Sequence, residues 1–337
     1  MRDFMDSQLT KVLQVQDASV QIKNNKNQLS ITEGVSFEIE KGETLGIVGE
    51  SGCGKSITAL SIIGLLPKNA EVTSGQIKLN GKNLLDLSND EYRALRGKDM
   101  SMIFQDPMTS LNPVYTVGYQ ISEQLHVHTD LSKRQYMKRV IELLRLVGIP
   151  RPEEIVKEYP HQLSGGMRQR VMIAMGLACD PGLLIADEPT TALDVTIQAQ
   201  ILELMKDLQD ELDMSILFIT HDLGVVAEIC DRVIVMYAGQ VVEEANVNTL
   251  FDHPKHPYTV GLMESTPKLG EHRDQLYSIE GTVPQIDQMP KGCRFADRCP
   301  KAFDKCFIET PTEFQTEDHS KVRCWLYSEE REEVIRV

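Results

Sequence analysis

The first part of the chain alternates hydrophobic and polar residues, and later parts contain short, wholly hydrophobic runs. Residues 13–46 alternate as β-strands do, and within and just after them residues 35–40 and 44–49 are expected as separate strands. Strands are expected at 183–187 and 215–220, where the uninterrupted hydrophobic residues 183–186 and 216–219 are typical of strands that are covered on both faces. The pattern therefore predicts several strands, of which at least two lie deep in the protein.

Between these runs, hydrophobic residues recur at helical spacing over 55–66 and 196–212. Strands that alternate with helices predict an α/β sheet with helices on both faces. After about residue 250, proline and glycine interrupt the pattern repeatedly. We therefore expect one domain over residues 1–250 and a small, irregular second domain over residues 251–337.

The composition is that of an ordinary globular protein, with 337 residues, 41% hydrophobic and 25% charged. Lys and Arg number 35 against 50 Asp and Glu, which gives a net charge of −15. Such an acidic balance disfavours nucleic acid as a partner, because its binding needs clustered cations. No hydrophobic run approaches the roughly 20 residues that cross a bilayer, and the N-terminus lacks a signal peptide. We expect a cytoplasmic chain whose membrane role, if any, comes through a partner.

A glycine-rich sequence lies between a predicted strand and a predicted helix and fits the pattern G-x-x-x-x-G-K-[ST]. Its residues are Gly49, Glu50, Ser51, Gly52, Cys53, Gly54, Lys55 and Ser56. In this context the backbone N–H groups and the helix N-terminus can bind phosphate, with Lys55 on the β- and γ-phosphates and Ser56 on Mg²⁺. A glycine-rich turn without a ligand is the structural alternative.

The hydrophobic run 183–187 ends in two carboxylates, Asp187 and Glu188. Together with the phosphate-binding pattern, they predict a hydrolytic site in which Asp187 holds Mg²⁺ and Glu188 activates the attacking water. By themselves two such carboxylates would equally well cap a helix.

The sequence LSGGMRQR at 163–170 resembles the signature of ABC transporter ATPases, although Met167 stands where glutamine is commonest. The resemblance implies a P-loop NTPase core of ABC type, with an antiparallel β subdomain and a helical subdomain at about residues 106–170. It also implies that Ser164, Gly165 and Gly166 contact the ATP of an opposite subunit, so that the ATPase works as a dimer.

Further residues resemble positions of that family. Gln105 resembles the glutamine that senses the γ-phosphate and contributes to the Mg²⁺ site, and His221 resembles the switch histidine. Asp194 ends a D-loop-like sequence that begins at Thr191. Ile22 stands where the family usually stacks an aromatic residue on adenine, so the group that holds the base is left open.

FQDPMTSLNP at 104–113, HPYT at 256–259 and the cysteine-rich tail resemble the ATPases of oligopeptide and dipeptide importers. The resemblance implies two transmembrane permease subunits, a second ATPase subunit that is related but not identical, and an extracytoplasmic substrate-binding protein. The chain would then sit at the cytoplasmic face of the membrane and hydrolyse ATP to drive peptide uptake. Import of nickel, metallophores or glutathione, and a soluble ABC ATPase without transport, are the alternatives.

The tail holds four of the seven cysteines, Cys293, Cys299, Cys306 and Cys324. Buried free thiols are one interpretation, but the charged neighbours Arg294 and Arg298 argue against a hydrophobic core. A zinc site is a second interpretation, although the short C-x₂₋₄-C spacing of structural zinc is missing. Wider spacings suit a [4Fe–4S] cluster, and the resemblance to importer ATPases favours it.

Overall fold

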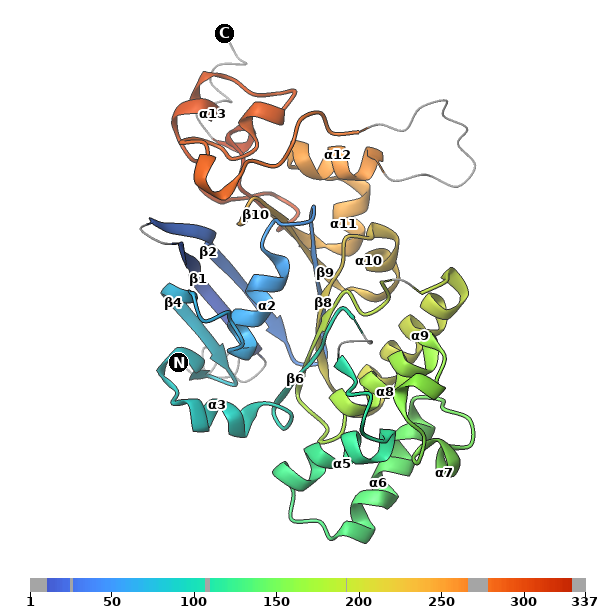
Figure 1. Ribbon diagram of the computed structural model, residues 1–337. Helices are drawn as coiled ribbons and strands as arrows, with labels where there is room; N and C mark the ends of the chain where they lie inside the picture. Colours follow the sequence, from blue (N-terminus) through green and yellow to red (C-terminus); the bar gives the residue numbers. More distant parts are fainter. Residues whose placement is uncertain (1–10, 25–26, 107–109, 192, 266–277, 329–337) are drawn as a thin grey trace, which may run out of the picture.

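The computed structural model of the protein describes residues 11–24, 27–106, 110–191, 193–265 and 278–328. In these residues the strands form two sheets, and most helices cover the larger sheet or form a separate helical part (Figure 1). The α/β class, with an antiparallel sheet and a helical part, is therefore confirmed.

The larger sheet has the strand order β11-β12-β10-β9-β3-β8-β7-β6. Its strands are β3 (Thr44–Val48), β6 (Met100–Ile103), β7 (Leu183–Asp187), β8 (Ser215–Ile219), β9 (Arg232–Tyr237), β10 (Gln240–Asn246), β11 (Phe314–Gln315) and β12 (Lys321–Val322). The strands from β9 to β6 pair in parallel. All residues of β3, β7 and β8 are buried, which explains why their sequences are hydrophobic without alternation.

The smaller sheet is antiparallel and has the strand order β2-β1-β4-β5. Its strands are β1 (Lys11–Asn24), β2 (Asn27–Glu40), β4 (Ala70–Leu79) and β5 (Lys82–Asn83). Val15 and Ala18 are both buried although three positions separate them, because the register of β1 shifts between them. Asp17 takes a positive φ of 48° at this bulge, so strict alternation fails there and the hydrophobic face is kept.

The helices of the described residues are α2 (Lys55–Ile63), α3 (Asn89–Leu95), α5 (Val117–His128), α6 (Lys133–Leu146), α7 (Pro152–Ile155), α8 (Gly165–Gly176), α9 (Val195–Leu212), α10 (Leu223–Ile229), α11 (Val247–Asp252), α12 (Pro257–Ser265) and α13 (Asp304–Ile308). Helix α2 contacts strands of both sheets and lies between them (Figure 1). Helices α5, α6 and α8 pack on one another as the helical part. The predicted helix at 55–66 ends early, because Gly64 takes a left-handed conformation with φ 67°.

The described residues after 250, called the C-terminal region below, pack against both sheets. Strand β12 pairs with β10 through Val322 opposite Glu243 and Lys321 opposite Glu244, so the tail extends the larger sheet. The 3₁₀ turn Ile286–Gln288 contacts β2 of the smaller sheet. The division of the chain between residues 250 and 251 stays a prediction.

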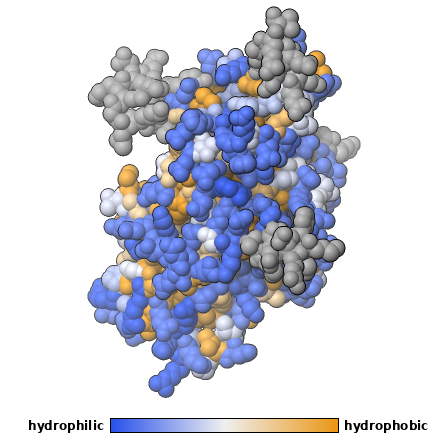
Figure 2. Space-filling view, turned by 180° about the vertical axis from the view of Figure 1, so that it is seen from behind, coloured by the Kyte–Doolittle hydropathy of each residue, from blue (hydrophilic) through white to orange (hydrophobic). Residues whose placement is uncertain are grey.

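The surface seen from behind is mainly hydrophilic, with small separate hydrophobic areas (Figure 2). Within the described ranges, no helix has both the length and the hydrophobicity that a membrane span requires.

Candidate active site

The predicted site residues follow strands of the larger sheet. The glycine-rich loop follows β3, Gln105 comes shortly after β6, Asp187 ends β7 and His221 follows β8. Because β3, β6, β7 and β8 run in parallel, these positions share one edge of the sheet. This carboxyl edge is where ligands bind in open α/β sheets.

The glycine-rich loop has a backbone shape that depends on glycine. Gly49 and Gly54 have φ values of 152° and 104°, and a Cβ on Gly49 would lie 2.2 Å from the carbonyl oxygen of Met236. The Nζ of Lys55 donates to the carbonyls of Gly49 at 2.8 Å and Glu50 at 3.2 Å. The buried ammonium is therefore held inside the curve of the loop, at the N-terminus of α2, and can meet an anion there.

The rest of the loop divides into exposed and buried positions. Ser51 and Gly52 are exposed, whereas Cys53 is buried, and burial raises the pKa of its thiol. The loop thus presents backbone to solvent at its tip and anchors itself through Cys53, whose carbonyl accepts from the Gly239 N–H at 2.9 Å.

Ser56 and Asp187 meet beside the loop, where the Ser56 hydroxyl donates to Oδ1 of Asp187 at 3.1 Å. Asp187 is 7% exposed, and burial raises the pKa of its carboxyl. A hydroxyl and a carboxylate at this distance supply the hard oxygen ligands that Mg²⁺ prefers, so these residues fit the predicted ion.

Three side chains contact the carboxylate of Glu188. Its Oε2 accepts from Gln105 Nε2 at 2.8 Å and from the Thr191 hydroxyl at 3.0 Å, and its Oε1 lies 3.1 Å from Nδ1 of His221. The Glu188 backbone has a φ of 48° and its N–H donates to the carbonyl of Ile219 at 2.9 Å. The carboxylate is therefore fixed at the strand end. Sequence reasoning missed the Thr191 contact, although its place three residues after Glu188 is a turn spacing that could have indicated it.

The signature residues lie at the start of a helix. Ser164 is the N-cap of α8 and its hydroxyl accepts from the Met167 N–H at 3.3 Å. A Cβ on Gly166 would lie 3.0 Å from Cγ2 of Ile197, the residue whose N–H donates to the capping Asp194 at 3.0 Å.

The starts of α8 and α9 therefore lie side by side, and Gly165 faces open space. Ala192, within the D-loop-like sequence, lies outside the described residues. In the part of the chain that is described, no hydrogen bond joins Ser164, Gly165 or Gly166 to Lys55 or Glu188.

Ile22 lies in β1, opposite Leu29 of β2 and Ala70 of β4, and is half-buried. These are ordinary neighbours in a sheet. Its place against adenine stays a prediction.

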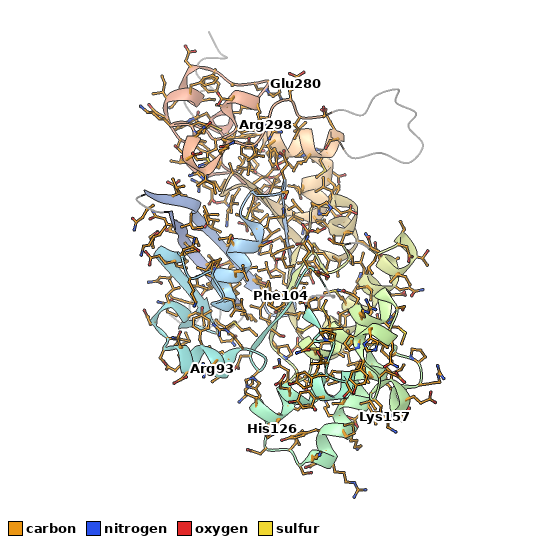
Figure 3. The ribbon with its side chains drawn as sticks, in the orientation of Figure 1. Arg93, Phe104, His126, Lys157, Glu280 and Arg298 are labelled. Carbon is orange, nitrogen blue, oxygen red and sulfur yellow. The ribbon has the colours of Figure 1, made fainter. Side chains whose placement is uncertain are left out.

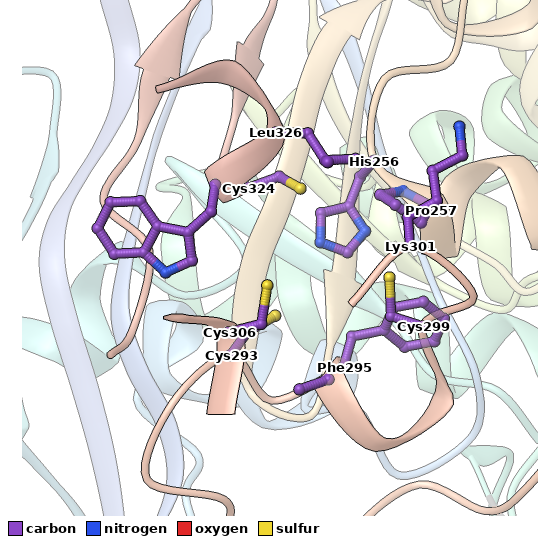
Figure 4. A pocket seen from close by; sticks show the side chains of 11 residues that line it. His256, Pro257, Cys293, Phe295, Cys299, Lys301, Cys306, Cys324 and Leu326 are labelled. Atoms are coloured by element: carbon purple, nitrogen blue, oxygen red, sulfur yellow. The ribbon is translucent and has the colours of Figure 1, made fainter. Parts of the chain in front are cut away.

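The four tail cysteines line one small cavity of about 10 Å³ (Figure 4), together with Phe295, Trp325 and His256. Cys306 belongs to a buried hydrophobic cluster with Ala296 and Trp325, and Cys293 packs against it. The expectation that this segment forms no hydrophobic core was wrong. Arg294 and Arg298 extend away from the cavity to ion pairs with Glu33 and Glu50, which leaves a hydrophobic surrounding for the thiols.

Burial raises the pKa of Cys293 to about 11, that of Cys324 to about 12, and that of Cys299 above its usual value. A cavity of about 10 Å³ has room for about one water molecule. Among the described residues, no group of three or more His, Cys, Asp or Glu is placed so that it could hold a metal ion. As they stand, the cysteines do not fit a [4Fe–4S] cluster or zinc, and that prediction lacks support from the structure.

A loop that encloses a lysine at a helix N-terminus, beside a Ser–Asp pair and a fixed glutamate, defines a P-loop nucleoside triphosphatase. The family model "ABC transporter" matches residues 32–191, and the model "Oligopeptide/dipeptide transporter, C-terminal region" matches residues 242–306.

Curated relatives match almost the whole chain. The oligopeptide transport ATP-binding protein AppD of Bacillus subtilis is 54% identical over 96% of this chain and 98% of its own length. The dipeptide transport ATP-binding protein DppD of Escherichia coli is 47% identical over 93% of this chain and 96% of its own length. The chain belongs to the ABC transporter family, in its group of oligopeptide and dipeptide transport ATP-binding proteins, and is an ATPase.

Solved structures agree in fold. The ATP-binding cassette MJ0796, in a dimeric post-hydrolysis state bound to ADP and Pi, has a TM-score of 0.63 at 29% identity, covering 70% of this chain and 98% of that one. CbiO1 of Clostridium perfringens, part of an ABC transporter complex, has a TM-score of 0.62 at 30% identity, covering 72% and 92%.

Proposed function

We propose that this protein hydrolyses ATP to drive import of peptides through separate membrane subunits. The observation that carries the hydrolytic part is the position of Glu188, held by Gln105, Thr191 and His221 at the strand end beside the Ser56–Asp187 pair. The match to peptide transport ATP-binding proteins over nearly the full chain supports peptides as the cargo.

In this proposal Lys55 and the loop N–H groups bind the phosphates of ATP. Glu188 accepts a proton from the attacking water, and the Thr191 hydroxyl keeps the carboxylate aimed at that water. Gln105 and His221 can leave Glu188 for the γ-phosphate when ATP is bound, since both are exposed side chains at the mouth of the site.

Ser56, Asp187 and Gln105 would hold Mg²⁺, which would neutralise charge that develops on the phosphates. Asp187 is 7% exposed, so little solvent would compete with the ion for its carboxylate. The oxygen donors of Ser56 and Asp187 supply what the ion requires.

We also propose that two ATPase subunits share the sites. Ser164, Gly165, Gly166 and Asp194 would serve the ATP of the opposite subunit, because they lie at the starts of α8 and α9 and, among the described residues, the first three make no hydrogen bond to Lys55 or Glu188 of their own chain. The dimeric state of MJ0796 supports this arrangement. A related, non-identical second ATPase, two permease subunits and an extracytoplasmic binding protein complete the proposed importer, which places this chain at the cytoplasmic face of the membrane.

The [4Fe–4S] cluster stays a prediction. The four cysteines line one cavity, but its volume of about 10 Å³ is too small for the cluster, and no step of ATP hydrolysis is assigned to it. Purification without oxygen, followed by iron and sulfide analysis, tests it. A colourless protein without iron would end the prediction.

The test of hydrolysis is the variant Glu188→Gln. We expect kcat to fall by about 10²-fold or more, since the proton acceptor is removed while the hydrogen-bonding shape is kept. Binding of Mg-ATP should persist, and the variant should accumulate as an ATP-bound dimer in size-exclusion chromatography. Glu211→Gln, an exposed change on α9, is the matched control and should retain wild-type turnover. Wild-type turnover of Glu188→Gln would contradict the proposal.

The test of transport uses cells that lack the gene. Wild-type protein should restore uptake of labelled di- and oligopeptides, and Glu188→Gln should not. Restored uptake of nickel or glutathione in place of peptides would correct the cargo, and no effect on any uptake would favour an ATPase that is not coupled to transport.

A further inference from the structure

An acidic residue of the glycine-rich loop, Glu50, is contacted by two side chains from the C-terminal region. The Glu50 backbone N–H donates to the hydroxyl of Tyr258 on α12 at 2.9 Å. Arg298 Nη1 donates to both carboxylate oxygens of Glu50, each at 3.1 Å. The loop that receives phosphate is therefore held from outside by residues more than 200 positions away in sequence, since 208 and 248 positions separate the partners.

Arg298 is fixed independently of Glu50. Its side chain is only 6% exposed, and its Nε donates to the carbonyl of Glu280 at 3.0 Å. Figure 3 labels both residues. Nη1 also donates to the Tyr237 hydroxyl at 3.3 Å, and the guanidinium lies 5.9 Å from the ring centre of Phe295. An arginine held in this way presents its charge to Glu50 without a large loss of side-chain freedom.

The charge of Arg298 affects the phosphate site because of where Glu50 lies. Its carbonyl accepts from Lys55, the residue expected on the β- and γ-phosphates, so its carboxylate belongs to the same short loop as the anion site. An unpaired carboxylate there would repel a triphosphate, and the repulsion would be only partly screened because the glutamate side chain is 29% exposed.

We propose that Arg298 is a positioning residue for the nucleotide, because its charge neutralises Glu50. Together with Tyr258, it makes the C-terminal region part of the ATP site. This rests on the proposed function, in which the loop binds ATP. The C-terminal region then sets the nucleotide affinity of the core as well as packing against it. A packing role alone would predict that Arg298 acts through its contacts with the rings of Tyr237 and Phe295, whatever the charge of Glu50.

A charge cycle separates these two roles in the full chain. The dissociation constant of a non-hydrolysable ATP analogue with Mg²⁺ is measured for wild type, Arg298→Gln, Glu50→Gln and the double variant. We expect Arg298→Gln to weaken binding about tenfold, Glu50→Gln to bind at least as tightly as wild type, and the double variant to return to within about threefold of wild type. The loss of affinity in Arg298→Gln should shrink at high salt, because salt screens part of the repulsion between the Glu50 carboxylate and the triphosphate.

Two further variants complete the design. Arg298→Lys keeps the charge and should stay within about threefold of wild type. Arg294→Gln is the matched control, because Arg294 is as buried and pairs with Glu33, which lies outside the loop. It should leave the analogue affinity within about twofold of wild type.

An equal loss in Arg298→Gln and in the double variant would overturn the inference in favour of packing, and so would unchanged affinity in Arg298→Gln. If Arg298→Gln does not fold, Glu50→Gln remains decisive, since weaker binding by it would contradict the charge argument. Failure of the wild-type protein to bind the analogue would instead contradict the proposed function and leave the contacts of Arg298 as a packing feature.

Discussion

The nucleotide-binding core and the C-terminal region are stabilised in different ways. In the core, β3, β7 and β8 are buried along their whole length and belong to two large hydrophobic clusters. In the C-terminal region, β11 and β12 have two residues each, and a local hydrophobic cluster consists of Ala296, Cys306 and Trp325. A large buried area stabilises the first. The second has a small cluster of its own and joins the core through the buried rings of Tyr258 and Phe295, which belong to the core's cluster, and through a few directional contacts.

Several of those contacts are ion pairs with the core. Arg294 pairs with Glu33, Arg298 with Glu50, and Lys321 with Glu244. Partly buried ion pairs add little net stability, because desolvation opposes the attraction, but they fix geometry. The C-terminal region therefore packs on the core through two buried rings and, through Tyr258 and Arg298, also fixes the shape and charge of the P-loop.

The largest expected effect lies in the core. Lys55→Ala removes the buried ammonium that Gly49 and Glu50 hold at the phosphate site. We expect ATP hydrolysis to fall by about 10²–10³-fold, the range that one lost electrostatic contact to the reacting groups produces. Steady-state phosphate release measures this. Lys41→Ala, at an exposed lysine paired with Asp213, should behave as wild type, and a similar loss there would contradict a site-specific effect.

The next prediction concerns stability and not turnover, at a residue of the local hydrophobic cluster in the C-terminal region. Trp325 is 9% exposed, donates through Nε1 to the carbonyl of Glu309 at 2.9 Å and packs on Phe314. Trp325→Ala should lower the local free energy of unfolding by about 3–5 kcal/mol, from lost burial and a cavity. Hydrogen exchange should show faster exchange over residues 278–328.

The matched control is Phe307→Ala, because Phe307 on α13 is 51% exposed and should change stability by less than about 0.5 kcal/mol. If Trp325→Ala also accelerated exchange in β3 and β7, the two regions would be one cooperative unit and the contrast drawn above would fail.

The smallest effect concerns the fixation of Glu188. Thr191→Val removes a hydroxyl that donates to Oε2 at 3.0 Å, while Gln105 and His221 remain. We expect kcat to fall about fivefold to tenfold, consistent with about 1 kcal/mol for one hydrogen bond. Thr191→Ser keeps the hydroxyl and should recover most of the activity. A loss as large as that of Glu188→Gln would show that Thr191 acts directly on the reacting groups.

Much of the fold followed from local sequence. The hydrophobic runs at 183–187 and 215–220 became β7 and β8, and the glycine-rich pattern became the turn between β3 and α2. Less predictable were the bulge at Asp17, which the alternation of residues alone does not show, and the early end of α2 at Gly64. Both depend on single backbone conformations that hydrophobic patterning does not record.

The phosphate loop follows from local sequence, since the φ values at Gly49 and Gly54 favour glycine and the lysine follows at a fixed spacing. Local sequence also indicated Asp187 and Glu188 as a pair at one strand end. The long-range packing sets two further features: Arg294 and Arg298 turn away from the cysteines, and Arg298 meets Glu50 across 248 positions. The physical reason is that backbone conformation and strand burial are read from neighbours in sequence. The partner of a charge is set by which distant segments the packing of the sheets brings together.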